Sequence, residues 1–149
     1  MAWVALQGDL ESGENYLDQA EDLFEGEKYG LAIVSAEIHL ESQAKTMIER
    51  AVKRDAPSLQ EVLLQHPNNV KLRHPAGQKM IQRFLGVNVA QLPEWQDFRA
   101  HLGRRNEVVH GGKDFGESEA TRSIEVARKI WLQLVDAARQ AEEGSGPKD

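Results

Sequence analysis

The sequence has no cysteine, no long apolar run and few aromatic residues. Without cysteine, the 149-residue chain can hold no disulfide, no thiolate-bound zinc ion and no cysteine nucleophile. No stretch approaches the ~18 consecutive apolar residues of a membrane-spanning helix, and the first residues lack a basic segment ahead of an apolar run. We therefore expect no membrane segment, no signal peptide and a cytoplasmic location. The glycine-rich fingerprints of dinucleotide-binding and P-loop proteins are also missing, which argues against those nucleotide hydrolases.

Charge is distributed unevenly along the chain, whose net charge is −6. Residues 71–113 carry eight Lys or Arg against three Asp or Glu, whereas the segments on either side are acidic. A basic segment within an acidic chain can bind a polyanion at that part of the surface. The same distribution also suits solvated faces that balance acidic neighbours, so charge alone leaves both interpretations open.

Apolar residues recur every three or four positions along most of the chain, which is typical of amphipathic helices, and no strand-like alternation exceeds five residues. The pattern and its turn signals predict a first helix that stops near Gly26 and a second helix from Lys28 to Arg54. A short helix capped by Ser58 and a helix over 77–84 closed by Gly86 are expected next. The last two helices are expected from Pro93 to Gly111 and over 117–141. The expected fold is all-α: an up-down bundle of four or five helices over residues 1–141, with long second and last helices, followed by a disordered tail over 142–149.

Three polar residues break the apolar pattern of these helices. Arg105 falls on the apolar face of its helix, and Glu37 falls on the apolar line of the long second helix. His110 lies in the last turn of its helix, where the carboxyl end attracts a cationic side chain. One interpretation is a functional site; the other is a buried Glu37–Arg105 ion pair that fixes helix register, with His110 as a capping residue.

The local string from Arg104 to Gly112 reads RRNEVVHGG, and here the chain resembles the HEPN superfamily (higher eukaryotes and prokaryotes nucleotide-binding). The signature of that family is an Arg, commonly followed by a polar residue, and a His after four to six intervening residues. Arg105, Asn106 and His110 match it with four residues between. The context is also similar: the match closes an amphipathic helix, precedes a long last helix, and follows an acidic first helix and a long alanine-rich second one.

The resemblance implies a metal-independent endoribonuclease that acts on RNA as a homodimer without a cofactor. Its expected role is that of a toxin or defence protein. It assigns the catalytic roles to Arg105 and His110. Asn106 and Glu37 are expected to support them, Arg104 and Lys113 to bind phosphate, and a cognate antitoxin or regulatory protein to be a partner. Other members of the family are inactive, so the alternative is a non-catalytic HEPN module that dimerises or binds a nucleotide or a partner.

A second alternative comes from Glu107 and His110, which form a Glu-x-x-His pair like those of di-iron helical bundles. That site needs a second such pair, which the sequence lacks; Glu37 and Glu41 would have to contribute. The remaining histidines have no metal-ligand spacing and are expected at the surface or in turns: His66, His74 and His101. Three tryptophans lie on predicted apolar stripes and are expected in the core or at a dimer contact: Trp3, Trp95 and Trp131.

Overall fold

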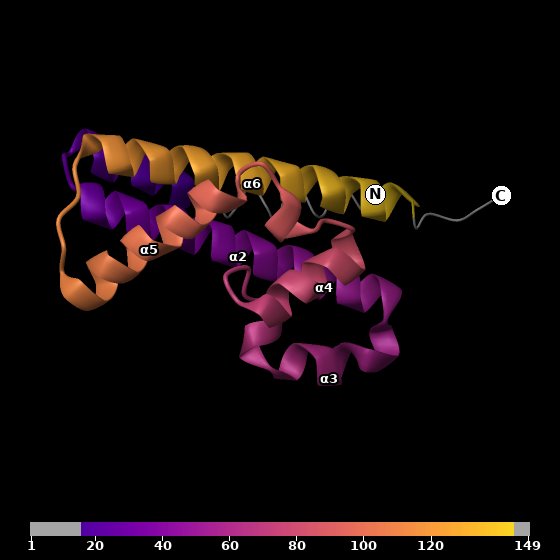
Figure 1. Cartoon of the computed structure of the whole chain (residues 1–149). Coiled ribbons are helices and arrows are strands. Elements are labelled where there is room, and N and C mark those ends of the chain that lie inside the picture. Colours follow the sequence, from indigo (N-terminus) through magenta and orange to yellow (C-terminus); the bar gives the residue numbers. More distant parts are fainter. Residues whose placement is uncertain (1–15, 145–149) are drawn as a thin grey trace.

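The computed structural model describes residues 16–144, and this part of the chain is all-α with no strand (Figure 1). A helix over residues 16–25 leads through a turn into the main elements. These are α2 (Tyr29–Asp55), α3 (Gln60–Gln65), α4 (Pro75–Leu85), α5 (Trp95–Gly111) and α6 (Glu117–Gly144), with short 3-10 turns over Pro57–Leu59, Pro67–Val70 and Val89–Gln91. No helix within residues 16–144 is long and apolar enough to cross a membrane.

The two longest helices, α2 and α6, pack along each other and form the spine of the fold (Figure 1). They run in the same direction, since Gln43 contacts Trp131 and Arg50 contacts Glu142. Their contact faces are rich in alanine, which lets the helix axes approach closely. The Trp131 indole is buried, as predicted, and its N–H donates to the Gln43 side chain at 3.0 Å.

Helix α5 crosses α2 in the opposite direction. A Cβ on Gly30, at the start of α2, would lie 3.4 Å from Val108 near the end of α5. About two turns further along α2, Glu37 lies next to His101, in the first half of α5. Phe98 anchors the first half of α5 because its ring is completely buried in the core. The end of α5 and the start of α2 therefore lie at the same end of the molecule.

The segment from 56 to 92, the least regular part of the sequence, forms α3 and α4 beside the second half of α2 (Figure 1). The His74 ring accepts the Ala76 N–H at 3.1 Å and caps α4. Gly86 ends α4 with a left-handed backbone (φ 74°), as the sequence predicted. Gly77 permits α4 to touch the preceding segment, because a Cβ there would lie 1.9 Å from the Lys71 carbonyl oxygen.

Several predicted boundaries need correction. Pro93 precedes the first residue of α5, Trp95, by two positions, and Ser58 lies inside a 3-10 turn and makes no side-chain cap. More importantly, the predicted tail begins too early, because α6 continues to Gly144 and Glu142 is buried. The rest of the predicted tail, 145–149, and Trp3 lie outside the described residues.

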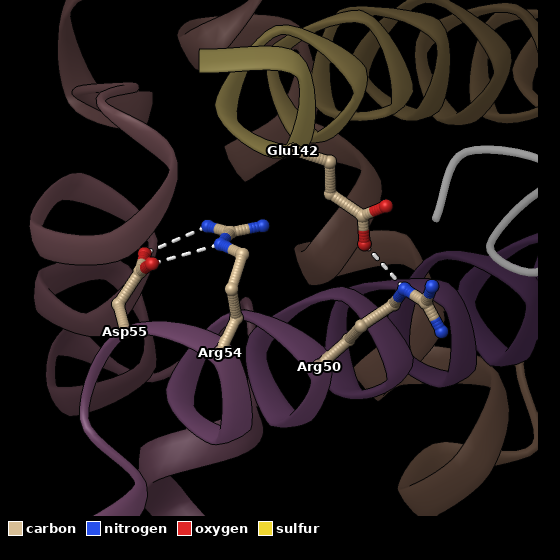
Figure 2. A network of polar contacts seen from close by, with 4 residues as sticks. All are labelled: Arg50, Arg54, Asp55 and Glu142. Carbon is tan, nitrogen blue, oxygen red and sulfur yellow. Dashed lines mark hydrogen bonds and ion pairs between the residues drawn. The ribbon is translucent and has the colours of Figure 1, made fainter. Parts of the chain in front are cut away.

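A buried ion pair explains why α6 continues beyond residue 141. The Glu142 carboxylate reaches across to the guanidinium of Arg50 on α2 (Figure 2). Its side chain is only 4% exposed, whereas that of Arg50 is 27% exposed. One turn further along α2, Arg54 makes a two-bond pair with Asp55. The periodicity of α6 gave no sign of this contact, because a glutamate near a helix end reads as solvent-exposed.

Candidate functional site

The second half of α5 holds most of the residues that the sequence singled out. The helix ends at Gly111, and Gly112 follows with a left-handed backbone (φ 61°). The N–H groups of Gly112 and Lys113 donate to the carbonyls of Val108 and Glu107, at 3.2 and 3.1 Å. These bonds satisfy the last carbonyls of α5 and turn the chain sharply away. His110 is thereby left exposed in the final turn.

Arg105, Asn106 and His110 form a continuous polar strip on α5. The Arg105 guanidinium donates to the Asn106 amide oxygen at 3.0 Å. Asn106 and His110 are one helical turn apart, a spacing at which side chains are neighbours. Arg105 is half-buried and has no ion pair among the described residues, while Asn106 and His110 are exposed. The charge of Arg105 is therefore uncompensated and open to an anionic ligand.

Glu37 does not form the predicted ion pair with Arg105. Its buried carboxylate instead lies 3.4 Å from Nε2 of His101, one turn before Arg105 on α5. His101 is completely buried, so its expected surface position is wrong as well. Periodicity correctly placed Glu37 on the buried face of α2. Which residue of α5 Glu37 contacts is decided only by the way α2 and α5 cross.

The two residues predicted to bind phosphate have protein partners. Nε of Arg104 donates to the Ser123 hydroxyl on α6 at 2.9 Å, and burial together with the nearby Arg122 lowers the pKa of Arg104. The Lys113 ammonium lies 2.9 Å from the Glu107 carboxylate and 4.9 Å from the centre of the Phe115 ring. The Lys113–Glu107 pair is weak, because both side chains are more than half exposed to solvent.

A groove of about 740 Å³ runs along the outer face of α2, and Arg105 lies at one edge of it. We call it the α2 groove. One wall is α2 from Val34 to Lys53; the other is formed by α3 and the segment up to Arg73. Its lining residues are Val34, Glu37, Ile38, Glu41, Ser42, Lys45, Glu49, Lys53, Gln60, Leu64, Gln65, Pro67, Val70, Lys71, Arg73 and Arg105.

Glu41 holds the two walls of the α2 groove together. Its two carboxylate oxygens accept the backbone N–H groups of Leu72 and Arg73, each at 3.0 Å. Burial and the nearby charge of Glu37 raise the pKa of Glu41 to about 7, against the opposing effect of Arg73. A carboxyl group that ties a backbone segment to a helix is a structural clamp, and its high pKa makes the clamp sensitive to pH.

No cluster of three or more possible metal ligands occurs within residues 16–144. Glu37 and Glu41, which a di-iron site would require beside Glu107 and His110, bind His101 and the backbone of residues 72 and 73 instead. Comparison of the chain with family models, with curated proteins and with solved structures found no match.

Sequence reasoning missed the α2 groove, although two signals pointed toward it. Lys71 and Arg73 open the basic segment 71–113, and Arg105 lies near its end. Glu41 follows Glu37 by one helical turn, so the two acids share a face of α2. The sequence did not indicate that α3 and the 66–73 segment fold back along α2, because that segment carries no clear helical period.

Proposed function

We propose that this chain is a metal-independent endoribonuclease of HEPN type that acts as a homodimer, in the role of a toxin or defence protein controlled by a partner protein. In this proposal the helix over 16–25, α2, α5 and α6 form the up-down bundle of that superfamily. The observation that carries the proposal is the strip of Arg105, Asn106 and His110: the Arg105 guanidinium makes no ion pair among the described residues and hydrogen-bonds Asn106, which lies one helical turn before the exposed His110.

RNA cleavage without a metal requires a base, an acid and a cation. A base removes the proton of the 2′-hydroxyl, whose oxygen attacks phosphorus; the bond from phosphorus to the 5′-oxygen breaks, and an acid protonates that oxygen. Imidazole can fill either role near neutral pH. The Arg105 guanidinium can hold two phosphate oxygens and stabilise the charge that develops on them. The products are a 2′,3′-cyclic phosphate and a 5′-hydroxyl.

Each chain supplies only one His110, so the proposal needs two copies. A twofold interface would bring one His110 from each copy together as base and acid. The surface at the end of α5 supports such an interface, because two large apolar side chains outside the α2 groove are exposed there: Leu31 at 55% and Val109 at 47%. The two belong to neighbouring segments, since Gly30 at the start of α2 lies against Val108 near the end of α5.

The test is RNA cleavage by purified protein in excess EDTA. We expect wild type to cut structured or single-stranded RNA and to leave the cyclic phosphate and 5′-hydroxyl ends, and His110→Ala to lose the activity. His66→Ala is the matched control, because His66 is also exposed but lies on the 66–70 turn, away from α5. Equal cutting by all three proteins would indicate a contaminating nuclease. No cutting by a folded dimeric wild type would favour the non-catalytic alternative.

A stability measurement separates a functional Arg105 from a structural one. Arg105→Ala should change the free energy of unfolding by less than about 1 kcal/mol, since the side chain is half-buried and hydrogen-bonds only its neighbour. His101→Ala, one turn away, should cost about 3 kcal/mol or more, because it removes a completely buried ring and leaves the buried Glu37 carboxylate without its polar neighbour. If Arg105→Ala is as damaging as His101→Ala, Arg105 has a structural role and the assignment fails.

A further inference from the structure

The α2 groove has a surplus of positive charge, because five basic residues and three carboxylates line it. Its three carboxylates all have partners: Glu37 lies against His101, Glu41 accepts the backbone N–H groups of residues 72 and 73, and Glu49 lies 3.8 Å from Lys45. Four basic residues of the groove have no ion pair among the described residues: Lys53, Lys71, Arg73 and Arg105. Their common feature is that they face one channel, so a ligand with several anionic groups can reach all of them.

The wall of the same groove is apolar where it lies close to α2 and α3. Val34, Ile38, Leu64 and Val70 contribute aliphatic surface between the basic residues, and Ile38 is 44% exposed. A ligand that fits such a groove combines regularly spaced anions with flat apolar groups. Single-stranded RNA has this chemistry, because its phosphates lie along one side and its unpaired bases are free to contact the protein. A duplex keeps its base faces stacked inside.

Arg105 connects this groove to the strip on α5, since the same guanidinium lines the groove and bonds Asn106. From Val34 to Lys53 the groove follows α2 for about 28 Å at 1.5 Å per residue, enough for several nucleotides. We propose that the α2 groove binds a single strand of RNA, with Lys53, Lys71 and Arg73 as phosphate-binding residues, and leads it to Arg105 and His110. The identity of the polyanion rests on the proposed function.

The experiment measures binding of a fluorescein-labelled oligouridylate by fluorescence anisotropy, in EDTA and over a range of salt concentrations. All proteins carry His110→Ala so that the probe stays intact. The groove variant carries Lys53→Gln and Lys71→Gln. Its matched control carries Lys79→Gln and Lys129→Gln, which remove the same charge from exposed positions on α4 and α6. Lys53→Gln alone tests the same point at an exposed position, should the double variant fold poorly.

We expect the groove variant to bind the oligouridylate about 10-fold more weakly at 0.15 M salt. Affinity for a single strand falls with salt to a power of about 0.7 per phosphate contact, so two lost contacts should lower that power by about 1.4, and Lys53→Gln alone should lower it by about 0.7. The control variant should keep the affinity and the salt dependence of the parent. If the groove variant and the control bind equally, the proposal is overturned.

Two further probes separate RNA from other polyanions. A duplex RNA and a polyglutamate peptide, each with the same label and number of charges, should bind more weakly and with little effect of the groove substitutions. Equal, groove-dependent binding of polyglutamate would assign the groove to an acidic protein segment and overturn the RNA assignment. Equal binding of the duplex would overturn the single-strand assignment.

The groove proposal and the nuclease proposal can be tested separately by measuring RNA cleavage with proteins that retain His110. If RNA is cut in a His110-dependent manner and the groove variant retains the full kcat/KM, the nuclease stands and the groove proposal falls. If oligouridylate binds through the groove but no RNA is cut, the groove stands and the nuclease proposal falls.

Discussion

Two glycines in neighbouring helices should respond in opposite ways to the same substitution. Gly77 lies in the first turn of α4, where a Cβ would sit 1.9 Å from the carbonyl oxygen and 2.5 Å from the carbonyl carbon of Lys71. Those atoms are backbone, so no side-chain rotation can relieve the clash. Gly103 lies inside α5, is exposed, and has no atom within 4 Å of an added Cβ.

The magnitudes follow from this geometry. Gly103→Ala gains the helix propensity of alanine, about 0.8–1.0 kcal/mol, at no steric cost. Gly77→Ala gains the same propensity but must push α4 from the 71–73 segment by more than 1 Å, because ordinary contacts begin at about 3.4 Å. Overpacking typically costs 1–3 kcal/mol, and a backbone clash belongs at or above the top of that range. We expect Gly77→Ala to be destabilised by about 3 kcal/mol.

The assay is urea unfolding of both variants and wild type, followed by circular dichroism at constant pH. In thermal unfolding, Gly77→Ala should lower the Tm by about 6–12 °C and Gly103→Ala should raise it by about 2–4 °C. The shift in Gly77→Ala should also disturb the α2 groove, since Lys71 and Arg73 belong to the segment that moves. A Gly77→Ala protein as stable as wild type would refute the close approach of α4 to this segment.

Two other predictions test the polar contacts of α2. Glu142→Ala should cost about 1.5–3 kcal/mol by removing a buried carboxylate that accepts a charge-assisted hydrogen bond from Arg50. Glu143→Ala, at the exposed neighbouring position, should change the free energy of unfolding by less than about 0.5 kcal/mol in chemical denaturation, and equal effects would contradict the Arg50–Glu142 pair. The pKa of Glu41 is raised from 4.5 to about 7 in the folded protein, so between these pH values the folded state binds the extra proton and stability falls as pH rises. The loss from pH 4.5 to 7 should approach about 3 kcal/mol for this group, and Glu41→Gln should remove it while the control Glu49→Gln keeps it; an unchanged pH dependence in Glu41→Gln would refute the raised pKa.

Local rules within the sequence determined the long helices and the ends that glycine marks. The period of the apolar residues identified the long α2 and α6, and Gly86 and Gly112 marked the ends of α4 and α5, since both adopt left-handed backbones there. Periodicity also placed Glu37 on an inward face and Trp131 in the core. The string from Arg105 to His110 identified the strip on α5 as the site to propose, and its activity stays a prediction.

Only the tertiary structure decided which side chains meet. The partner of Glu37 is His101 and not Arg105, because the crossing of α2 and α5 sets the register between them and neither helix encodes it alone. In the same way, Glu142 belongs to the fold because α6 runs parallel to α2 as far as Arg50. The α2 groove exists because the 66–73 segment, tied down by Glu41, folds back along α2. Periodicity gives the face of each helix, whereas packing between distant segments chooses the contacts on that face.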